Sequence, residues 1–505
     1  MTPFPRVNRQ CYEIAIHHGV MSPKRGGRVT GVTCTRLAVS LAMDGSSDEW
    51  RALRYLGGFH NHVETEALPG TLPVGQNSPQ HLPHGLYAEQ LSGTAFTAPR
   101  AANRRSWLYR LAPSVQQGAY TPHEAPSRLT AHFPVADPTP RRWGPLPRLA
   151  SPKVDFVDGM RTLCGTGAPA QKEGVAIHLY ACNAPMADRA LCDADGELLL
   201  VPQHGALRVA TELGRLLVAP GEIVVLPRGL RFSVSPDDAD GEGAECRGYA
   251  LELFAGRGFV LPELGAIGAN GLAEPRDFLT PTAWFEDRHC PQGFRVTTKY
   301  AGRLFDTTRT HSPFDVVAWH GNYAPYKYDL SRFHAVNTVT VDHPDPSIFT
   351  VLTCPSSEPG VAVADFVIFP PRWMCAEHTF RPPYFHRNVM SEFMGLIRGA
   401  YDAKAAGDGG FLPGGASLHV ACTPHGPDAG AYAGAIASDT SVPHRFDGGL
   451  AFMFETSGML QLTEYAVDPE LCNVQQDYAA CWQGLPRASL PAQLQPSECS
   501  PGAAL

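Results

Sequence analysis

Turn signals divide the stretch from residue 174 to 235 into a series of short apolar runs. The core of it reads GELLLVPQHGALRVATELGRLLVAPGEIVVLPRGLRFSV, and pairs such as Asp195-Gly196, Pro220-Gly221 and Arg228-Gly229 interrupt the runs. The interruptions come at intervals of about eight to ten residues, and no helix-period pattern competes with them. Short strands at such spacing are typical of a β-sandwich or jelly roll, so we expect a mainly β chain.

The rest of the chain extends this pattern into two halves. Its 49 glycines and 46 prolines are spread over 505 residues, and a second strand-rich block begins near residue 331. We therefore expect a larger β-rich domain over 55–330 and a smaller β domain over 331–490. Residues 1–54 are predicted to be a flexible extension and residues 491–505 a disordered tail. The segment PGEIVVLPRG is similar to a strand signature of cupin barrels.

Composition excludes several classes of function. A net charge of −8 and the lack of a basic stripe argue against nucleic acid as a partner. No apolar run approaches the ~18 residues that cross a membrane. The 13 cysteines are odd in number and form no C-x-x-C pair. This pattern argues against both a disulfide framework and a thiolate zinc site. We expect a cytoplasmic protein.

One apolar segment of the second half contains the residues with the clearest chemistry. It reads FRPPYFHRNVMSEFMGLIRG over 380–399 and places His386 six residues before Glu392. A carboxylate among Phe, Met, Leu and Ile is costly unless a cation meets it. That cation is either one of the three arginines of the segment, which would be structural, or a metal ion. The spacing alone leaves both interpretations open.

The metal interpretation matches a known ligand set. Two imidazoles and one carboxylate form the facial triad of non-haem iron(II) oxygenases, which leaves coordination positions for substrate and oxygen. The third ligand would come from SLHVACTPHGPD, as either His419 or His425. Cupins often carry the pattern H-x-H-x3-4-E-x6-G. This chain matches it from His386 to Gly399 except that Asn388 replaces the central histidine, which lowers the ligand count from four to three.

Several long segments carry a likeness to one family. In the second half they are the 380–399 segment, VDHPDPSIFTVLT, VADFVIFPPRW, GGFLPGGASLH and TPHGPD. In the first half they are LYAEQLSGTAF, NRRSWLYR, LGAIGANGLAEPRDFLTPTAWFED and VVAWHGNYAPYKYDL. From Tyr55 to about residue 485 the chain resembles the homogentisate 1,2-dioxygenase family.

The resemblance implies an enzyme with iron(II) as its cofactor, one ion per subunit. Such an enzyme opens the ring of homogentisate with O2 to give 4-maleylacetoacetate, a step of tyrosine and phenylalanine catabolism. It also implies a cytoplasmic homohexamer built as a dimer of trimers, with the iron in the smaller C-terminal β domain.

Residue roles carry over by motif. The resemblance implies three metal ligands: His386, Glu392 and His425. It implies that His343 is the catalytic base, that Tyr401 and His425 contact the substrate, and that His419 packs behind the ligands or lines the pocket. Arg387 is a candidate for meeting the acetate group. The loop KAAGDGGFLPGG is slightly long for the family.

Two other classes of function fit the same residues. A cupin isomerase or hydrolase could use zinc or manganese at this site, since ligand preferences do not exclude those metals. A cupin that only binds a ligand is the third option. Oxygen uptake separates the dioxygenase from both.

Overall fold

A computed structural model describes residues 46–149, 153–237, 244–342, 345–404 and 410–490. These residues form mainly β-strands. The α-helices among them are short: α1 (Ser47–Arg51), α2 (Phe156–Gly159), α3 (Ala429–Ala437) and α4 (Glu464–Val467). The prediction of a mainly β chain is confirmed.

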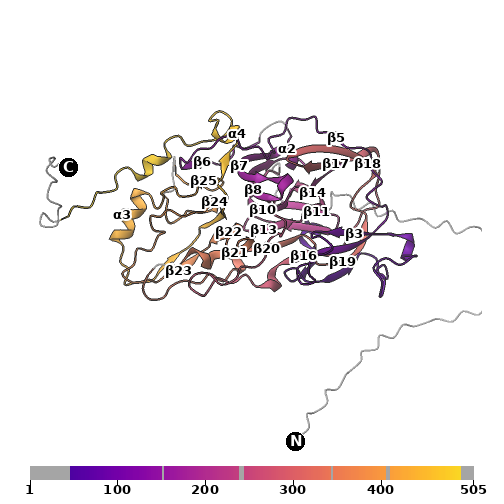
Figure 1. The fold of residues 1–505 in the computed structure, drawn as a ribbon, viewed down its shortest axis with the longest axis horizontal. Coiled ribbons are helices and arrows are strands. Elements are labelled where there is room, and N and C mark those ends of the chain that lie inside the picture. The colour runs from indigo at the N-terminus through magenta and orange to yellow at the C-terminus, as the bar shows by residue number, and fades with distance from the viewer. Residues whose placement is uncertain (1–45, 150–152, 238–243, 343–344, 405–409, 491–505) are drawn as a thin grey trace, which may run out of the picture. The chain divides into compact units, whose positions relative to one another are not determined.

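The largest sheet has nine strands and lies at the centre of the described structure (Figure 1). Its strands in spatial order are β1 (Tyr55–Gly57), β16 (Leu279–Pro281), β20 (Tyr326–Asp329), β13 (Glu222–Leu226), β10 (Glu197–His204), β15 (Cys246–Leu253), β8 (Glu173–Cys182), β7 (Met160–Ala168) and β28 (Gln461–Leu462). Every pairing within it is antiparallel.

Two further sheets complete the N-terminal half. The first has seven strands: β12 (Gly214–Val218), β11 (Leu207–Thr211), β14 (Arg231–Pro236), β9 (Arg189–Asp193), β17 (His289–Tyr300), β18 (Arg303–His311) and β5 (Thr121–Pro122). The second has four: β2 (Val63–Glu66), β19 (Val316–Gly321), β4 (Arg105–Arg110) and β3 (Tyr87–Ser92).

The C-terminal half is built on a six-stranded sheet. Its strands are β21 (Thr350–Pro355), β22 (Ala362–Phe369), β27 (Leu450–Thr456), β24 (Ser391–Arg398), β25 (Ala416–His419) and β6 (Arg141–Trp143). A small sheet pairs β23 (Arg372–Met374) with β26 (His444–Phe446). A larger β-rich N-terminal half joined to a smaller C-terminal β half is the predicted fold class, which is thereby confirmed.

The continuous apolar runs of the central strands follow from their burial on both faces. Alternate residues of a strand point to opposite faces. In β10, Leu198 and Leu200 belong to the core shared with the seven-stranded sheet. Leu199 and Val201 belong to the core shared with the six-stranded sheet. The nine-stranded sheet is therefore the middle layer, as the succession of β24, β10 and β14 in Figure 1 shows.

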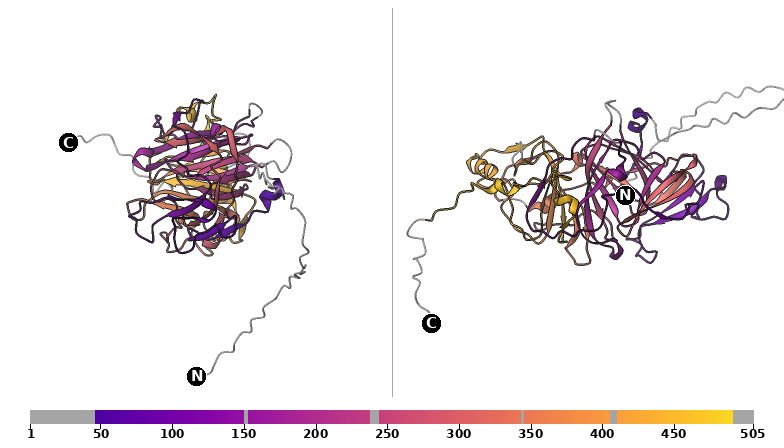
Figure 2. Two further views of the ribbon diagram at one scale, coloured as in Figure 1. Left: turned by 90° about the vertical axis from the view of Figure 1, so that its right-hand side faces the viewer. Right: turned by 90° about the horizontal axis from the view of Figure 1, so that it is seen from above.

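Each half contributes a strand to a sheet of the other. The indigo strand β6, from the N-terminal half, pairs with β25 in the six-stranded sheet (Figure 1). The yellow C-terminal strand β28 pairs with β7 in the nine-stranded sheet. Tyr249 of β15 adds a further link, because its hydroxyl donates to the carbonyls of Leu396 (3.2 Å) and Gly415 (2.8 Å). The right-hand view in Figure 2, seen from above, shows the two halves side by side.

The start of the described chain differs from the sequence prediction. Within the predicted extension 1–54, residues 1–45 lie outside the described residues, but residues 46–54 are packed on the N-terminal half. Trp50 of α1 is only 2% exposed, and the guanidinium of Arg215 lies 5.1 Å from its ring centroid. Glu49 forms an ion pair with Arg215 at 2.7 Å. The folded part therefore begins before residue 55. The predicted tail 491–505 also lies outside the described residues.

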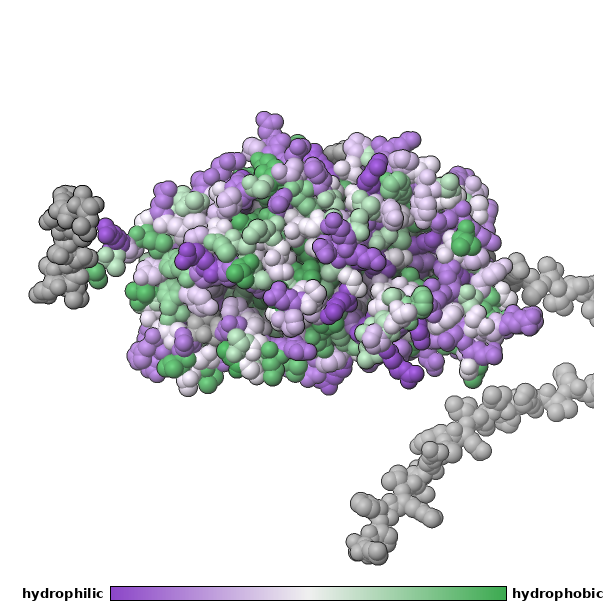
Figure 3. Space-filling view, in the orientation of Figure 1, coloured by the Kyte–Doolittle hydropathy of each residue, from purple (hydrophilic) through white to green (hydrophobic). Residues whose placement is uncertain are grey.

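Hydrophilic and hydrophobic residues are intermixed on the face of the molecule shown in Figure 3. Among the described residues, none of the helices has the length and apolar character needed to cross a membrane.

Candidate metal centre

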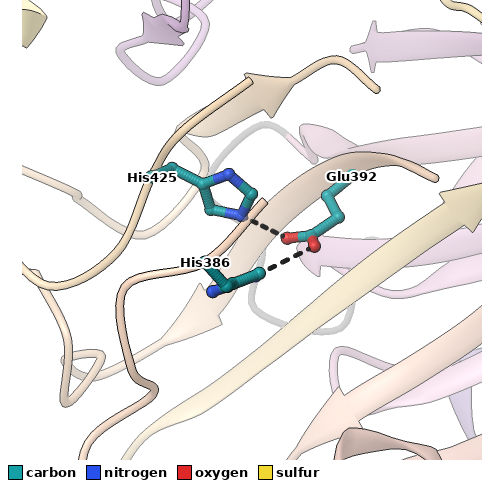
Figure 4. A group of neighbouring side chains, drawn as sticks. All are labelled: His386, Glu392 and His425. Carbon is teal, nitrogen blue, oxygen red and sulfur yellow. Dashed lines mark hydrogen bonds and ion pairs between the residues drawn. The ribbon is translucent and has the colours of Figure 1, made fainter. Parts of the chain in front are cut away.

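His386 and His425 are brought together by backbone pairing. The amide of His386 donates to the carbonyl of His425 (2.9 Å), and the amide of His425 donates back to the carbonyl of His386 (3.1 Å). Gly426 permits this approach, because a Cβ at that position would lie 2.9 Å from the Cα of Phe385. Glu392 follows near the start of β24, so three side chains from two segments converge (Figure 4).

The three side chains have the separations of ligands around one ion. The Nε2 atom of His386 lies 3.3 Å from Oε1 of Glu392, and the Nε2 atom of His425 lies 3.0 Å from Oε2 (Figure 4). Candidate ligand atoms from all three lie within 4.8 Å of one another. Ligand atoms about 2.1 Å from an ion and at right angles are about 3.0 Å apart, so the group fits one face of an octahedron.

Backbone carbonyls fix the tautomer of both imidazoles. Nδ1 of His386 lies 2.8 Å from the carbonyl oxygen of Tyr384, and Nδ1 of His425 lies 2.9 Å from that of Thr423. A carbonyl only accepts, so each Nδ1 carries the hydrogen. In the neutral rings both Nε2 lone pairs then face a carboxylate, an arrangement that calls for a cation between them.

The charge balance supports the same conclusion. Glu392 is 6% exposed. Burial acts to raise its pKa, but the hydrogen bonds from His386 and His425 outweigh burial and hold the pKa well below its ordinary value. The hydrogen bond to Glu392 raises the pKa of His386. The proton that His386 holds offsets the charge of the carboxylate, and a metal ion would replace it.

Asn388, which replaces the central histidine of the cupin pattern, supports the carboxylate. Its Nδ2 donates to Oε1 of Glu392 at 2.6 Å, and its Oδ1 accepts from the amide of Met390 at 2.6 Å. The side chain is therefore fixed at both ends. Metal-binding carboxylates are commonly oriented by such a donor.

The structure also separates the two histidines that spacing left as alternatives. His425 belongs to the ligand group, whereas His419 stacks behind it with ring centroids 4.2 Å apart and an interplanar angle of 6°. His419 is 1% exposed and its Nε2 lies 2.9 Å from the Tyr478 hydroxyl. Burial lowers its pKa well below the ordinary value, so the ring is neutral.

The other predicted site residues have different outcomes. His343 lies outside the described residues. Tyr401 is 7% exposed and lies on the wall of a cavity beside the ligand group. Its ring meets that of Phe369 edge-on, with centroids 5.6 Å apart. Arg387 lines the cavity too but is exposed.

The cavity has a volume of about 410 Å³ and contains carboxylates that the sequence analysis missed. Strand pairing puts Asp365, Glu455, Glu392 and His419 in register across β22, β27, β24 and β25. Burial raises the pKa of Glu455 to about 8 and that of Asp365 to about 6. As isolated acids, Asp365 and Glu455 gave no signal in the sequence. Only the correct pairing of β22, β27 and β24 would have shown that they lie beside Glu392.

Lys404 is a second missed residue of the cavity. It is the first residue of the long loop noted in the sequence and had no predicted role. Its ammonium donates to Ser417 Oγ at 2.9 Å.

A buried acidic group in the N-terminal half contains its own cation. Asp193, Asp195 and Glu252 lie close enough to hold a metal ion. However, the ammonium of Lys299 is 2.8 Å from Asp195 and 2.5 Å from Glu252, and His178 contacts Glu252 at 3.1 Å. The lysine therefore supplies the positive charge that a metal would bring.

Comparison with solved structures finds distant cupin-like neighbours. YlbA from E. coli is 9% identical with a TM-score of 0.30, over 65% of this chain and 96% of that one. A cupin 2 barrel protein from Leptotrichia buccalis is 7% identical with a TM-score of 0.25, over 57% and 84%. A deletion mutant of Bacillus subtilis oxalate decarboxylase is 11% identical with a TM-score of 0.23, over 62% and 79%. Such values carry no argument about function.

Family models are more informative. Residues 54–330 match the model described as homogentisate 1,2-dioxygenase N-terminal, and residues 331–489 match homogentisate 1,2-dioxygenase C-terminal. The two matches together include every residue of the ligand group and of the cavity. The chain belongs to the homogentisate 1,2-dioxygenase family.

Proposed function

We propose that this protein is an iron(II)-dependent dioxygenase that converts homogentisate and O2 to 4-maleylacetoacetate in tyrosine and phenylalanine catabolism. Family membership from residue 54 to 489 supports the reaction. The observation that carries the metal requirement is the ligand group: two imidazole Nε2 atoms at 3.3 and 3.0 Å from one carboxylate, with both tautomers fixed.

His386, Glu392 and His425 would hold the iron, one ion per subunit. When bound, iron(II) supplies a redox-active centre that binds substrate and O2 together and so avoids the slow direct reaction of triplet O2 with an aromatic ring. Three protein ligands leave the positions for these partners open.

The residues of the cavity would bind the aromatic ring and exclude water. Phe369, Met394 and Met453 provide apolar walls, and the ring of Tyr401 packs against Phe369 in a T-shaped contact. In the proposal Tyr401 and His425 contact the substrate. Such a cavity orients the ring relative to the ligand group and keeps a reactive intermediate from hydrolysis.

His343 is proposed as the base that takes the proton from a phenol hydroxyl, since a neutral imidazole is suited to that step. The role rests on the VDHPDP motif. His343→Ala should retain bound metal but lower turnover by roughly 10²–10⁴. Loss of metal in this variant would show that the role is misassigned.

The proposal includes assembly and location. By family membership the protein would be a cytoplasmic homohexamer, a dimer of trimers, without nucleic acid or membrane as a partner. Light scattering coupled to size exclusion would give the mass of the particle, and a monomer at working concentration would contradict the hexamer.

The deciding experiment is anaerobic loading with iron(II), followed by homogentisate and air. We expect one O2 consumed per homogentisate and an absorbance rise from the enol-diketone product. Ring chemistry without O2 uptake on zinc or manganese would favour a cupin isomerase or hydrolase. Intact homogentisate recovered from metal-loaded protein would leave only a binding protein. Either result overturns the proposal.

A further inference from the structure

Lys404 is a buried cation on the cavity wall. It is 7% exposed, and its ammonium makes a hydrogen bond to Ser417 Oγ at 2.9 Å. It also faces the rings of Phe411 and Tyr478, with centroids 5.1 and 5.6 Å away. Within the described part of the chain, no carboxylate forms an ion pair with it. An ammonium buried in this way is costly unless an anion meets it.

The other cations of the cavity are already compensated. Arg372 forms an ion pair with Asp402 at 2.8 Å and lies over the ring of Phe349. Arg387 is exposed, so water solvates its charge. The uncompensated buried charge on this wall is therefore that of Lys404. Burial, together with the charge of Arg142, lowers its pKa to about 7, and the attraction of Glu392 and Asp428 is too weak to offset the loss of water.

Lys404 and the ligand group are separated by a distance that one aromatic acid can span. Ser417, which anchors the ammonium, pairs with Met394, and His419, two residues further along β25, pairs with Glu392. Residues two apart on a strand lie on the same face about 7 Å from one another. A hydroxyphenylacetate spans a comparable length, so its hydroxyl could reach the ligand group while its carboxylate reaches Lys404.

The charges around the cavity favour one orientation of such a ligand. Asp365 and Glu455 lie on β22 and β27, on one side of Glu392 in the sheet. Ser417 and the ammonium that it anchors lie at β25, on the other side. A ligand carboxylate is thus attracted toward β25, whereas the described residues of β22 and β27 that line the cavity offer it carboxyl groups and no cation.

We infer that Lys404 binds the carboxylate of the substrate and makes the cavity selective for aromatic diols that carry an anionic side chain. The inference deepens the proposed function and depends on it for the identity of the reaction. Arg387, the cation that the sequence analysis put forward for the acetate, is exposed and is not needed for this role.

The test compares two ligands that differ in the anionic group, homogentisate and the neutral 2-methylhydroquinone. Anaerobic calorimetric titrations use metal-free and zinc-loaded protein, so that binding is measured without turnover. Wild type should prefer homogentisate at least about tenfold. Lys404→Met should weaken homogentisate about 10- to 100-fold and change the neutral diol by less than about threefold.

Two variants control for general effects. Lys404→Arg keeps the charge and should recover part of the affinity for homogentisate. Lys153→Met removes an exposed lysine that does not line the cavity and should bind both ligands as wild type does. In the iron-loaded enzyme Lys404→Met should raise KM for homogentisate while kcat/KM for the neutral diol stays near wild type.

Three results would overturn the inference: wild type binding both ligands equally, Lys404→Met binding homogentisate normally, or an equal loss for both ligands. The last would mean that Lys404 only shapes the cavity. A wild-type enzyme without O2 uptake would refute the proposed reaction instead, and the titrations would still decide the role of Lys404.

Discussion

Asn388 offers the sharpest test of the metal centre, because it contacts Glu392 without being a proposed ligand. Asn388→Ala removes the 2.6 Å hydrogen bond from Nδ2 to Oε1 of Glu392. The backbone pairing remains, since the carbonyl of residue 388 still accepts from the amide of Cys422. The carboxylate would keep its charge but lose the group that orients it.

The size of the effect follows from the bond that is lost. A hydrogen bond to a charged group contributes about 2 kcal/mol, which corresponds to ~30-fold in an equilibrium constant. Loss of a partner that orients a metal ligand lowers metal affinity 10- to 100-fold, a range that includes the ~30-fold obtained from the hydrogen bond. We therefore expect about 30-fold weaker binding of iron(II), with turnover per bound iron much less affected.

Metal affinity would be measured by competition with a chelator under anaerobic conditions. Asn103→Ala removes a half-buried amide that does not line the cavity and should leave the affinity unchanged. The double variant with Glu392→Gln adds a second check, because the effect of Asn388→Ala should disappear once the carboxylate is gone. Wild-type affinity in Asn388→Ala, or an undiminished loss in the double variant, would refute the reasoning.

Three further predictions concern the ligand group and the cores. Glu392→Gln should lower metal affinity more than about 100-fold, because an amide lacks the negative charge; metal content after dialysis measures this. Tyr249→Phe removes one of the donors to two buried carbonyls, each of which keeps a backbone amide donor, and should lower the free energy of unfolding by about 0.5–1.5 kcal/mol in urea titrations. Burial lowers the pKa of His178 to about 3, against about 6.5 in an unfolded chain. Between these two pKa values the unfolded chain binds a proton that folded His178 does not. The free energy of unfolding should therefore fall by about 2 kcal/mol as the pH is lowered from 6.5 to 5. His178→Gln should make the free energy of unfolding less dependent on pH over this range.

Each of these three predictions has an outcome that would contradict it. Full metal occupancy in Glu392→Gln would exclude this carboxylate as a ligand. An unchanged urea midpoint in Tyr249→Phe would mean that the backbone amides alone satisfy the two carbonyls. If the pH dependence of unfolding is the same with and without His178, its proton uptake is not coupled to folding.

The sequence predicted the fold class because strand alternation is a local signal. The runs around β10 and β13 were visible as strands, since burial on both faces makes them uniformly apolar. β6 was missed because 115–150 gave no strand signal and a strand of three residues carries too few positions for a pattern. β28 lies in an apolar segment of the second half, but its pairing with the first half was not predicted. Their pairing is decided by tertiary contacts.

The candidate site was predictable only in part for a related reason. His386 and Glu392 are close in sequence, so their spacing was informative. Spacing could not choose between His419 and His425, because the choice depends on the backbone pairing of residues 386 and 425. Glu455 reaches the cavity through strand register, and Lys404 reaches it from the segment after β24, where it contacts Ser417 of β25; sequence spacing encodes neither.

The exchange of β6 and β28 has a consequence for any attempt to divide the chain. A fragment starting at residue 331 would lack β6, leaving the outer edge of β25 open beside Ser417 and His419. An uncovered edge invites association with other chains. The N-terminal fragment would in turn lack the strand that borders β7. Separate expression should therefore give aggregating pieces, whereas co-expression should let each supply the missing strand. A protease nick between the halves should not release them from one another.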